Sequence, residues 1–336
     1  MTANAAPAST TASSRFKTWA GHLLRVGIGA VVVGYLIKSG ALKPALLWTA
    51  IHQHPLLYAS AFLIYLIPLQ VCSWARWYWF LRAAKVPITL GASIRLHLTG
   101  LFFNGFLPGG TGGDIAKGWY LLKGRGKTES AAALGTMVAD RVTGMFGLIG
   151  LAAVANLVNM DLWSSSPTLF VQAVFILCVA AAVSLLTATF LSPWSFKRIP
   201  KAVPASEILA PETPRGFMAE FGLALASFRK YPVPFLGGIG LSVGVHLFLI
   251  LIYALCAGAL DVSLPFRLHA YVAPTLTFAN GIPISPAGLG VGEAAGKLLY
   301  TAVGATHGQA EIPALVHSIG LIIALLAAPA YLLKKK

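Results

Sequence analysis

Between Lys230 and Asp261 the sequence reads YPVPFLGGIGLSVGVHLFLILIYALCAGAL, without a single Asp, Glu, Lys or Arg. A helix needs about 20 apolar residues to cross about 30 Å of hydrocarbon, and this stretch is longer than that. Other charge-free stretches of this kind lie between Lys43 and Arg76, between Asp161 and Lys197, and between Glu311 and Lys334. We therefore expect an all-α integral membrane protein.

The composition supports this class of protein. Hydrophobic residues make up 57% of the chain and charged residues 10%, whereas soluble domains carry about 25% charged residues. The net charge of +15 does not indicate nucleic-acid binding, because the basic residues cluster in short segments between apolar stretches, as in the positive-inside pattern. The three cysteines, Cys72, Cys178 and Cys256, form no close pair and so predict neither a metal site nor a disulfide framework.

The apolar pattern predicts about six to eight membrane spans in a single domain, residues 15–336, after a disordered tail, residues 1–14. The first apolar segment fits an uncleaved helix better than a cleaved signal peptide, because no small-residue cleavage site precedes Lys38. We expect helices near Trp19–Ile37, Pro55–Leu81, Ser130–Leu157, Thr168–Leu191, Val233–Leu260 and Ile312–Leu333, with glycine-broken apolar segments at Ile94–Leu122 and His269–Gly304.

Lys and Arg residues predict the orientation. With the N-terminus inside, nearly all basic segments between spans fall on the cytoplasmic side of the inner membrane, and so do both termini and the loop Ser192–Tyr231. Within that loop the apolar residues recur about every 3.6 positions. They predict a short helix that lies either on the membrane surface or against the protein's own underside: Phe217, Phe221, Leu225 and Phe228.

The two broken segments resemble each other. The first contains NGFLPGGTGGDIAK, Asn104–Lys117, and the second contains NGIPISPAGLGVGE, Asn280–Glu293. Each has Asn-Gly, then proline, a glycine-rich turn and a carboxylate, so they form a weak internal repeat. Such irregular backbone survives at membrane depth only when it is buried in protein or lines a wet cavity. We expect two broken or re-entrant segments of opposite orientation, a possible inverted repeat of the kind found in transporters.

A helix that begins after each glycine-rich turn would point free N–H groups into such a cavity, which favours an anion such as phosphate. Asp114 and Glu293 would alternatively cap those helix ends. Glycines that only let helices pack closely are the simpler alternative.

Arg141 is the next candidate, because the charge-free residues 142–160 follow it. A charge at the bilayer centre costs about 2.5–3.5 kcal/mol, so we expect Arg141 to face the interior and to pair with Asp114 or Glu293. Its neighbour Asp140 should point elsewhere on the helix. The alternative is an Arg141 side chain that extends to the interface. His97, His246 and His317 fit packed or interfacial positions.

These motifs resemble the flippase-like family that includes the transmembrane region of lysylphosphatidylglycerol synthase. The family pattern matches the two segments above and Asp140, Arg141 and Gly144, over about residues 15–333, with departures at Lys117, Ala287 and Gly292. With this resemblance, the candidate substrate-binding residues are Asn104, Pro108, Gly109, Gly110, Gly112, Gly113, Asp114, Lys117, Asp140, Arg141, Asn280, Pro283, Pro286, Gly288, Gly290 and Glu293.

The resemblance implies a membrane protein that moves or handles lipids. We expect a lipid translocase without cofactor, metal or catalytic residues, whose partners are membrane lipids with anionic head groups and, as one option, a separate lipid-synthesis enzyme. The sequence ends at Lys336 without the family's soluble aminoacyl-transferase domain, so we do not expect it to make lysylphosphatidylglycerol. Two alternatives stay open: a membrane-embedded transferase acting on a lipid-linked substrate, and a non-catalytic partner of a lipid synthase.

Overall fold

The computed structural model describes residues 34, 37–38, 43–105, 112–191, 232–281 and 291–332. Within these residues all regular secondary structure is helical, which confirms the expected all-α fold. Residues Ala45–Lys336 belong to one compact unit. Most of the expected helix Trp19–Ile37 and the loop 192–231, with its apolar stripe, lie outside the described residues.

Five helical stretches of the described residues are long and apolar enough to cross a membrane: Pro55–Ala83, Ala132–Val158, Pro167–Ala188, Val233–Gly258 and Glu311–Tyr331. They match five of the six helices that the sequence predicts. The helices that form them are α3 (Pro55–Ile64), α4 (Gln70–Ala83), α7 (Lys127–Val158), α8 (Pro167–Leu191), α12 (Pro232–Gly258), α15 (Glu311–Leu326) and α16 (Ala328–Leu332). Two short additions are α2 (Pro44–Gln53) and a 3₁₀ turn, η2 (Met160–Ser164).

Proline explains two interruptions within these spans. A π-helical turn, η1 (Tyr65–Leu69), joins α3 to α4 and contains Pro68, which has no N–H group to donate to the preceding turn. Helix α15 ends at Leu326, just before Pro329, whose ring clashes with the carbonyl group four residues earlier in a continuous helix. Neither interruption separates a span into two membrane crossings.

The two broken segments each form a pair of short helices. The first pair is α5 (Leu90–Asn104) and α6 (Gly112–Leu122), and the second is α13 (Phe266–Asn280) and α14 (Val291–Ala302). The helices of each pair lie against each other, so we call the pairs hairpin 1 and hairpin 2. They contain 15, 11, 15 and 12 residues. At 1.5 Å per residue each helix is about 16–23 Å long, which is too short to cross the hydrocarbon.

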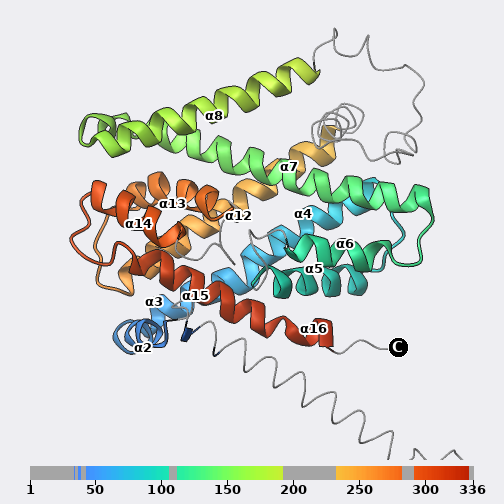
Figure 1. Ribbon diagram of the computed structural model, residues 1–336, viewed down its shortest axis with the longest axis horizontal. Helices are drawn as coiled ribbons and strands as arrows, with labels where there is room; N and C mark the ends of the chain where they lie inside the picture. Colours follow the sequence, from blue (N-terminus) through green and yellow to red (C-terminus); the bar gives the residue numbers. More distant parts are fainter. Residues whose placement is uncertain are drawn as a thin grey trace, which may run out of the picture. The chain divides into compact units, whose positions relative to one another are not determined.

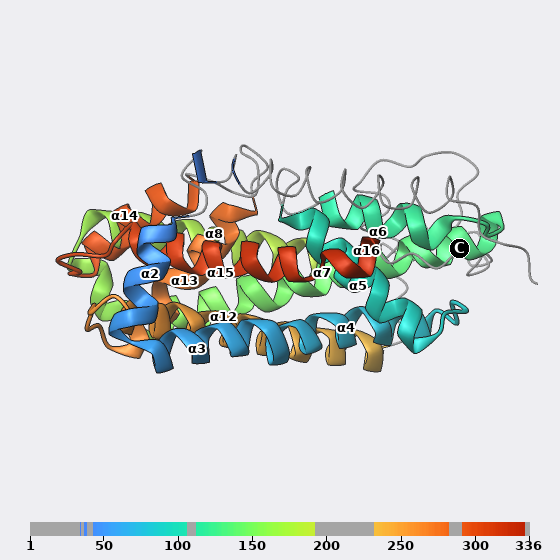
Figure 2. The same cartoon turned by 90° about the horizontal axis from the view of Figure 1, so that it is seen from below.

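Helix α15 lies between the two hairpins and contacts both. A Cβ atom on Gly105, at the end of α5, would lie 2.7 Å from Ala324 of α15, and one on Gly296 of α14 would lie 2.5 Å from Pro313. Helix α15 is the best buried of the five spans, with 61% of its most apolar window inside the protein. On another side of the unit, α12 runs along α3 and α4 (Figure 2).

The hairpins point in opposite directions (Figure 1). At the base of hairpin 1, Arg125 donates a 2.7 Å hydrogen bond to the carbonyl group of Pro87. At the base of hairpin 2, Arg267 donates a 2.7 Å hydrogen bond to Asp161, in the turn between α7 and α8. Helix α7 begins at Lys127, next to the first base, and ends at Val158, next to the second. The two bases therefore lie at opposite ends of the spans, as the inverted repeat requires.

Candidate functional site

The tip of hairpin 1 is held by one side chain. Helix α5 ends at Asn104, and the Oδ1 atom of Asn104 accepts a 2.8 Å hydrogen bond from the backbone N–H group of Gly113, at the start of α6. A Cβ atom on Gly113 would overlap with the carbonyl oxygen of Gly100 and with the Asn104 side chain. Asn104 therefore connects the two helices through its hydrogen bond, and Gly113 allows the helices to lie close together because it has no side chain.

Hairpin 2 repeats this arrangement. Helix α13 ends at Asn280, and a Cβ atom on Gly292, in the first turn of α14, would overlap with the amide of Asn280. In both hairpins the next residue is acidic, Asp114 in α6 and Glu293 in α14, and lies in the first helical turn. A carboxylate there interacts favourably with the positive end of the helix dipole. The weak repeat in the sequence is thus a structural repeat.

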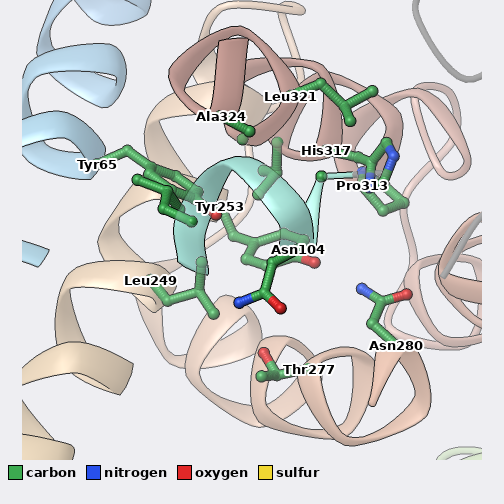
Figure 3. Close-up of a pocket in the computed structure, with 14 residues that line it drawn as sticks. Tyr65, Asn104, Leu249, Tyr253, Thr277, Asn280, Pro313, His317, Leu321 and Ala324 are labelled. Carbon is green, nitrogen blue, oxygen red and sulfur yellow. The ribbon is translucent and has the colours of Figure 1, made fainter. Parts of the chain in front are cut away.

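The two tips meet at one cavity of about 210 Å³. Asn104 comes to it from hairpin 1, and Asn280 and Thr277 come from hairpin 2; Figure 3 shows the three side chains around the same space. Other helices complete the wall with hydroxyl and imidazole groups and with apolar side chains, among them Tyr65, Tyr253 and His317. The cavity is therefore the place where both halves of the repeat contribute the same residue type.

The described residues that line the cavity carry hydrogen-bonding groups and none of them is Asp, Glu, Lys or Arg. The sequence between Asn104 and Asp114 and between Asn280 and Glu293 also contains no charged residue. The Nε2 atom of His317 is buried and has no hydrogen-bond partner among the described residues. A buried polar atom without a partner costs roughly 1–3 kcal/mol.

The charged candidates lie in a separate network. Asp114 of α6 forms an ion pair with Arg141 of α7, so of the two partners that the sequence predicts, Asp114 and Glu293, the structure shows the first. Lys117, one turn further along α6, lies 3.5 Å from Asp114, and its ammonium group sits 4.2 Å from the centre of the Trp77 ring. Lys117 is buried, whereas the Arg141 side chain is 48% exposed. The pairing of Arg141 is thus confirmed, whereas the expectation that Arg141 faces the interior is wrong, because 48% of its side chain is exposed.

Asp140 points to the other side of α7, also as predicted. It accepts a 2.7 Å hydrogen bond from the Nε atom of Arg76 in α4, and the Nη1 atom of Arg76 donates a 2.9 Å hydrogen bond to Ser242 of α12. All three side chains are buried. Gly144 lies beside the guanidinium group, and a Cβ atom there would be in ordinary van der Waals contact with it at 3.4 Å. This cluster joins α4, α7 and α12.

The profile of one protein family, described as "Lysylphosphatidylglycerol synthase TM region", matches residues 22–328, nearly the whole chain. The chain belongs to this family. A search of curated proteins found no match, and a search of solved structures found none either. As a member of the lysylphosphatidylglycerol synthase transmembrane-region family, the protein is a multi-pass membrane protein connected with lipid metabolism or lipid transport.

In this family member the predicted site residues divide into three groups. Asn104 and Asn280 line the cavity, while Asp114, Lys117, Asp140 and Arg141 belong to the ion-pair network. Gly112, Gly113 and Glu293 lie in the first turns of α6 and α14. The remaining candidates lie outside the described residues: Pro108, Gly109, Gly110, Pro283, Pro286, Gly288 and Gly290.

Sequence reasoning missed several residues. Arg76 was not among the candidate residues, although it is buried and paired. His317 was expected in a packed or interfacial position, and the structure places it in the lining of the cavity. Tyr65, Tyr253 and Thr277 lie in apolar helices and have no distinguishing neighbours in the sequence. Of these residues, only Arg76 could have been found from the sequence, because a cation inside a 29-residue apolar span needs a partner.

Proposed function

We propose that this protein is a lipid translocase, which moves a membrane lipid between the two leaflets by passing its polar head group through the cavity at the hairpin tips. The observation that carries the proposal is that Asn104 and Asn280, from two opposed hairpins, line one polar cavity. Hairpins of this kind bring irregular, hydrogen-bonding backbone to the middle of a membrane, where it must line a cavity or be buried.

The chemistry of the cavity suits a head group in transit. A hydroxyl or amide group moved from water into hydrocarbon without a hydrogen bond costs roughly 2–7 kcal/mol. The amides of Asn104 and Asn280 offer donors and acceptors together, so they can exchange partners with a head group of either kind. Because none of the described lining side chains is charged, the head group is not held by a strong ion pair with them and can leave on either side.

The size of the cavity supports the same function. Binding sites that enclose whole drug-sized molecules have volumes of roughly 300–1,000 Å³, and this cavity has about 210 Å³. It has room for a small head group and not for the acyl chains. The chains would remain in the bilayer while the head group crosses.

The network around Asp114 and Arg141 has a positioning role in this proposal. It ties hairpin 1 to α7, and Asn104 belongs to the same hairpin. No step of lipid movement requires a bond to be broken, so no catalytic residue is assigned. The head group itself is anionic in this proposal, because basic side chains line a second hollow at the base of hairpin 1.

Reconstitution tests the proposal. The wild-type protein in proteoliposomes should move a fluorescent phospholipid from the outer to the inner leaflet, measured by chemical quenching of the outer leaflet. Asp114→Asn and Glu293→Gln should slow this movement while both variants still insert and fold. Glu311→Gln, which removes an exposed carboxylate from the first turn of α15, is the matched control.

Three results would count against the proposal. Wild-type movement no faster than in protein-free liposomes would contradict lipid translocation. If both carboxylate variants moved lipid at the wild-type rate, Asp114 and Glu293 would be structural residues without a part in lipid movement. If mass spectrometry instead found that the lipid had been chemically modified, the protein would be a membrane-embedded transferase.

A further inference from the structure

A second hollow, with a volume of about 290 Å³, opens at the base of hairpin 1. We call it the basic pocket, because Arg95 of α5 and Lys123 and Arg125, just after α6, line it. None of the described residues around it is acidic. It shares no lining residue with the cavity at the hairpin tips.

The cations differ in how firmly they are held. Arg125 donates 2.7 Å hydrogen bonds from Nε to the carbonyl group of Leu121 and from Nη2 to that of Pro87, which fixes its guanidinium group. Its contact with Glu129 is long, at 3.5 Å. Arg95 and Lys123 are exposed, and no carboxylate among the described residues lies within ion-pair distance of either. The basic pocket therefore contains two cations without an ionic partner among the described residues, Arg95 and Lys123, and one cation with a fixed guanidinium group, Arg125.

The remaining wall of the basic pocket is apolar and aromatic. It consists of side chains such as Ile88, Leu96, Leu121 and Tyr331. A free phosphate ion would interact with the cations and would make no favourable contact with the apolar wall. A phospholipid would use both, because its phosphate can meet the cations while its glycerol and first methylene groups lie on the apolar side.

Helix α5 and the span Glu311–Tyr331 each contribute different residues to the two hollows. On α5, Thr99 lines the basic pocket and Asn104 lines the cavity, five residues or about 7.5 Å further along the helix axis. In that span, Ala324 of α15 lines the cavity and Tyr331 of α16 lines the basic pocket. Tyr331 also stacks on Phe102, with ring centres 5.8 Å apart. On α5, Phe102 thus lies between Thr99 of the basic pocket and Asn104 of the cavity, and it contacts Tyr331.

We propose that the basic pocket binds the phosphate of an anionic glycerophospholipid at the membrane surface and presents the head group to the cavity. Arg95 and Lys123 provide the charge, Arg125 provides a fixed hydrogen-bond donor, and the apolar wall selects a lipid over a free ion. The presentation step rests on the proposed translocase function, whereas the binding step does not.

Lipid binding to the purified, detergent-solubilised protein, followed by native mass spectrometry, tests the binding step. The probes are phosphatidylglycerol, phosphatidylcholine and inorganic phosphate. Arg95→Gln/Lys123→Gln should weaken phosphatidylglycerol binding about 30-fold, since each cation near a membrane surface adds roughly a factor of five. Arg82→Gln/Lys85→Gln is the matched control, because it removes two exposed cations that do not line the basic pocket.

Each result decides one point. Loss of phosphatidylglycerol binding in the first double variant, with binding kept in the control, supports the proposal. Equal binding in both variants, or equal loss in both, overturns it. Inorganic phosphate that displaces phosphatidylglycerol at equal concentration would make this a site for the free ion and overturn the lipid assignment. A wild-type protein that binds phosphatidylglycerol at this site and moves no lipid would contradict the translocase function alone.

Discussion

Arg76 and Asp140 form a buried ion pair across helices α4 and α7, with 2.7 Å between Nε and Oδ1. Ser242 of α12 accepts a further hydrogen bond from the same guanidinium group, so one side chain connects three membrane helices. The pair is the best enclosed of the ion pairs described in this structure, with the two side chains 10% and 11% exposed. It holds the helices against which hairpin 1 and the Asp114–Arg141 pair are arranged.

Removing one member of this pair should destabilise the protein. Asp140→Ala leaves the charge of Arg76 buried without a partner, which typically costs about 3–5 kcal/mol. We expect a large fall in the thermal unfolding temperature in detergent, and a smaller fall for the double variant Arg76→Met/Asp140→Leu, which leaves no orphaned charge. Arg267→Ala, which breaks an exposed pair, is the control. If Asp140→Ala were as stable as the control, the pair would have no structural role.

The Asp161–Arg267 pair at the opposite end predicts a pH dependence. The hydrogen bond from Arg267 holds the pKa of Asp161 below its usual value near 3.8. Because the folded-state pKa is the lower one, the contribution of this pair to stability is complete above about pH 4 and is lost as the pH falls through the folded-state value. The unfolding temperatures of the wild type and Asp161→Asn should therefore differ by a constant amount from pH 8 to pH 5 and converge below pH 4. A difference that shrinks between pH 8 and pH 6 would contradict this assignment.

The close approach at each hairpin tip predicts a matched pair of effects. Gly113→Ala and Gly292→Ala each insert a methyl group where Asn104 or Asn280 already lies, and overpacking of this kind typically costs about 1–3 kcal/mol. Both variants should unfold at lower temperature and lose lipid movement. Gly150→Ala in α7 meets no atom within 4 Å and should be neutral or stabilising, because alanine favours a helix. If either tip variant behaved like Gly150→Ala, the two tips would not be structural equivalents.

The orientation in the membrane can be tested with single cysteines in a background in which Cys72, Cys178 and Cys256 are replaced. The Lys and Arg distribution predicts that Ser165→Cys, in the turn between α7 and α8, reacts with an impermeant thiol reagent from outside the cell. Ser206→Cys, in the loop 192–231, should react only after the membrane is permeabilised. Labelling in the reverse order would invert the topology and put the basic pocket on the outer face.

The spans were predictable because each is a long apolar stretch with few or no charged residues, a pattern that is typical of a membrane environment. The hairpins were predictable in outline, since Asn104 and Asn280 begin two similar glycine-rich segments that cannot continue a regular helix. The short helix α2 was not expected, because residues 44–53 are apolar and continuous with the following span in the sequence. The π-helical turn after α3 contains Pro68. The sequence alone does not give the start of this turn, because the hydrogen-bond register of the helix has to be known first.

The site was less predictable than the fold. The cost of a charge in an apolar span predicted that Arg141 pairs with Asp114 or Glu293, and the structure shows the pair with Asp114. Arg76 was missed because a cation near the end of a span resembles an interfacial one, and its partners Asp140 and Ser242 are 64 and 166 residues away. The cavity was expected to be polar. Its uncharged lining was not expected, because the charged candidates satisfy one another in the network between α4, α6, α7 and α12.

The central claim, that the two opposed tips form one path for a lipid head group, is tested most directly by the rate of lipid movement in proteoliposomes that contain Asn104→Ala/Asn280→Ala. The control is Asn156→Ala, which truncates a buried asparagine of α7 that does not line the cavity. Each lost amide removes hydrogen bonds worth roughly 1 kcal/mol apiece to the head group, so we predict a rate at least about tenfold lower for the double variant and a near wild-type rate for the control. A folded, inserted double variant that moves lipid at the wild-type rate would contradict the account.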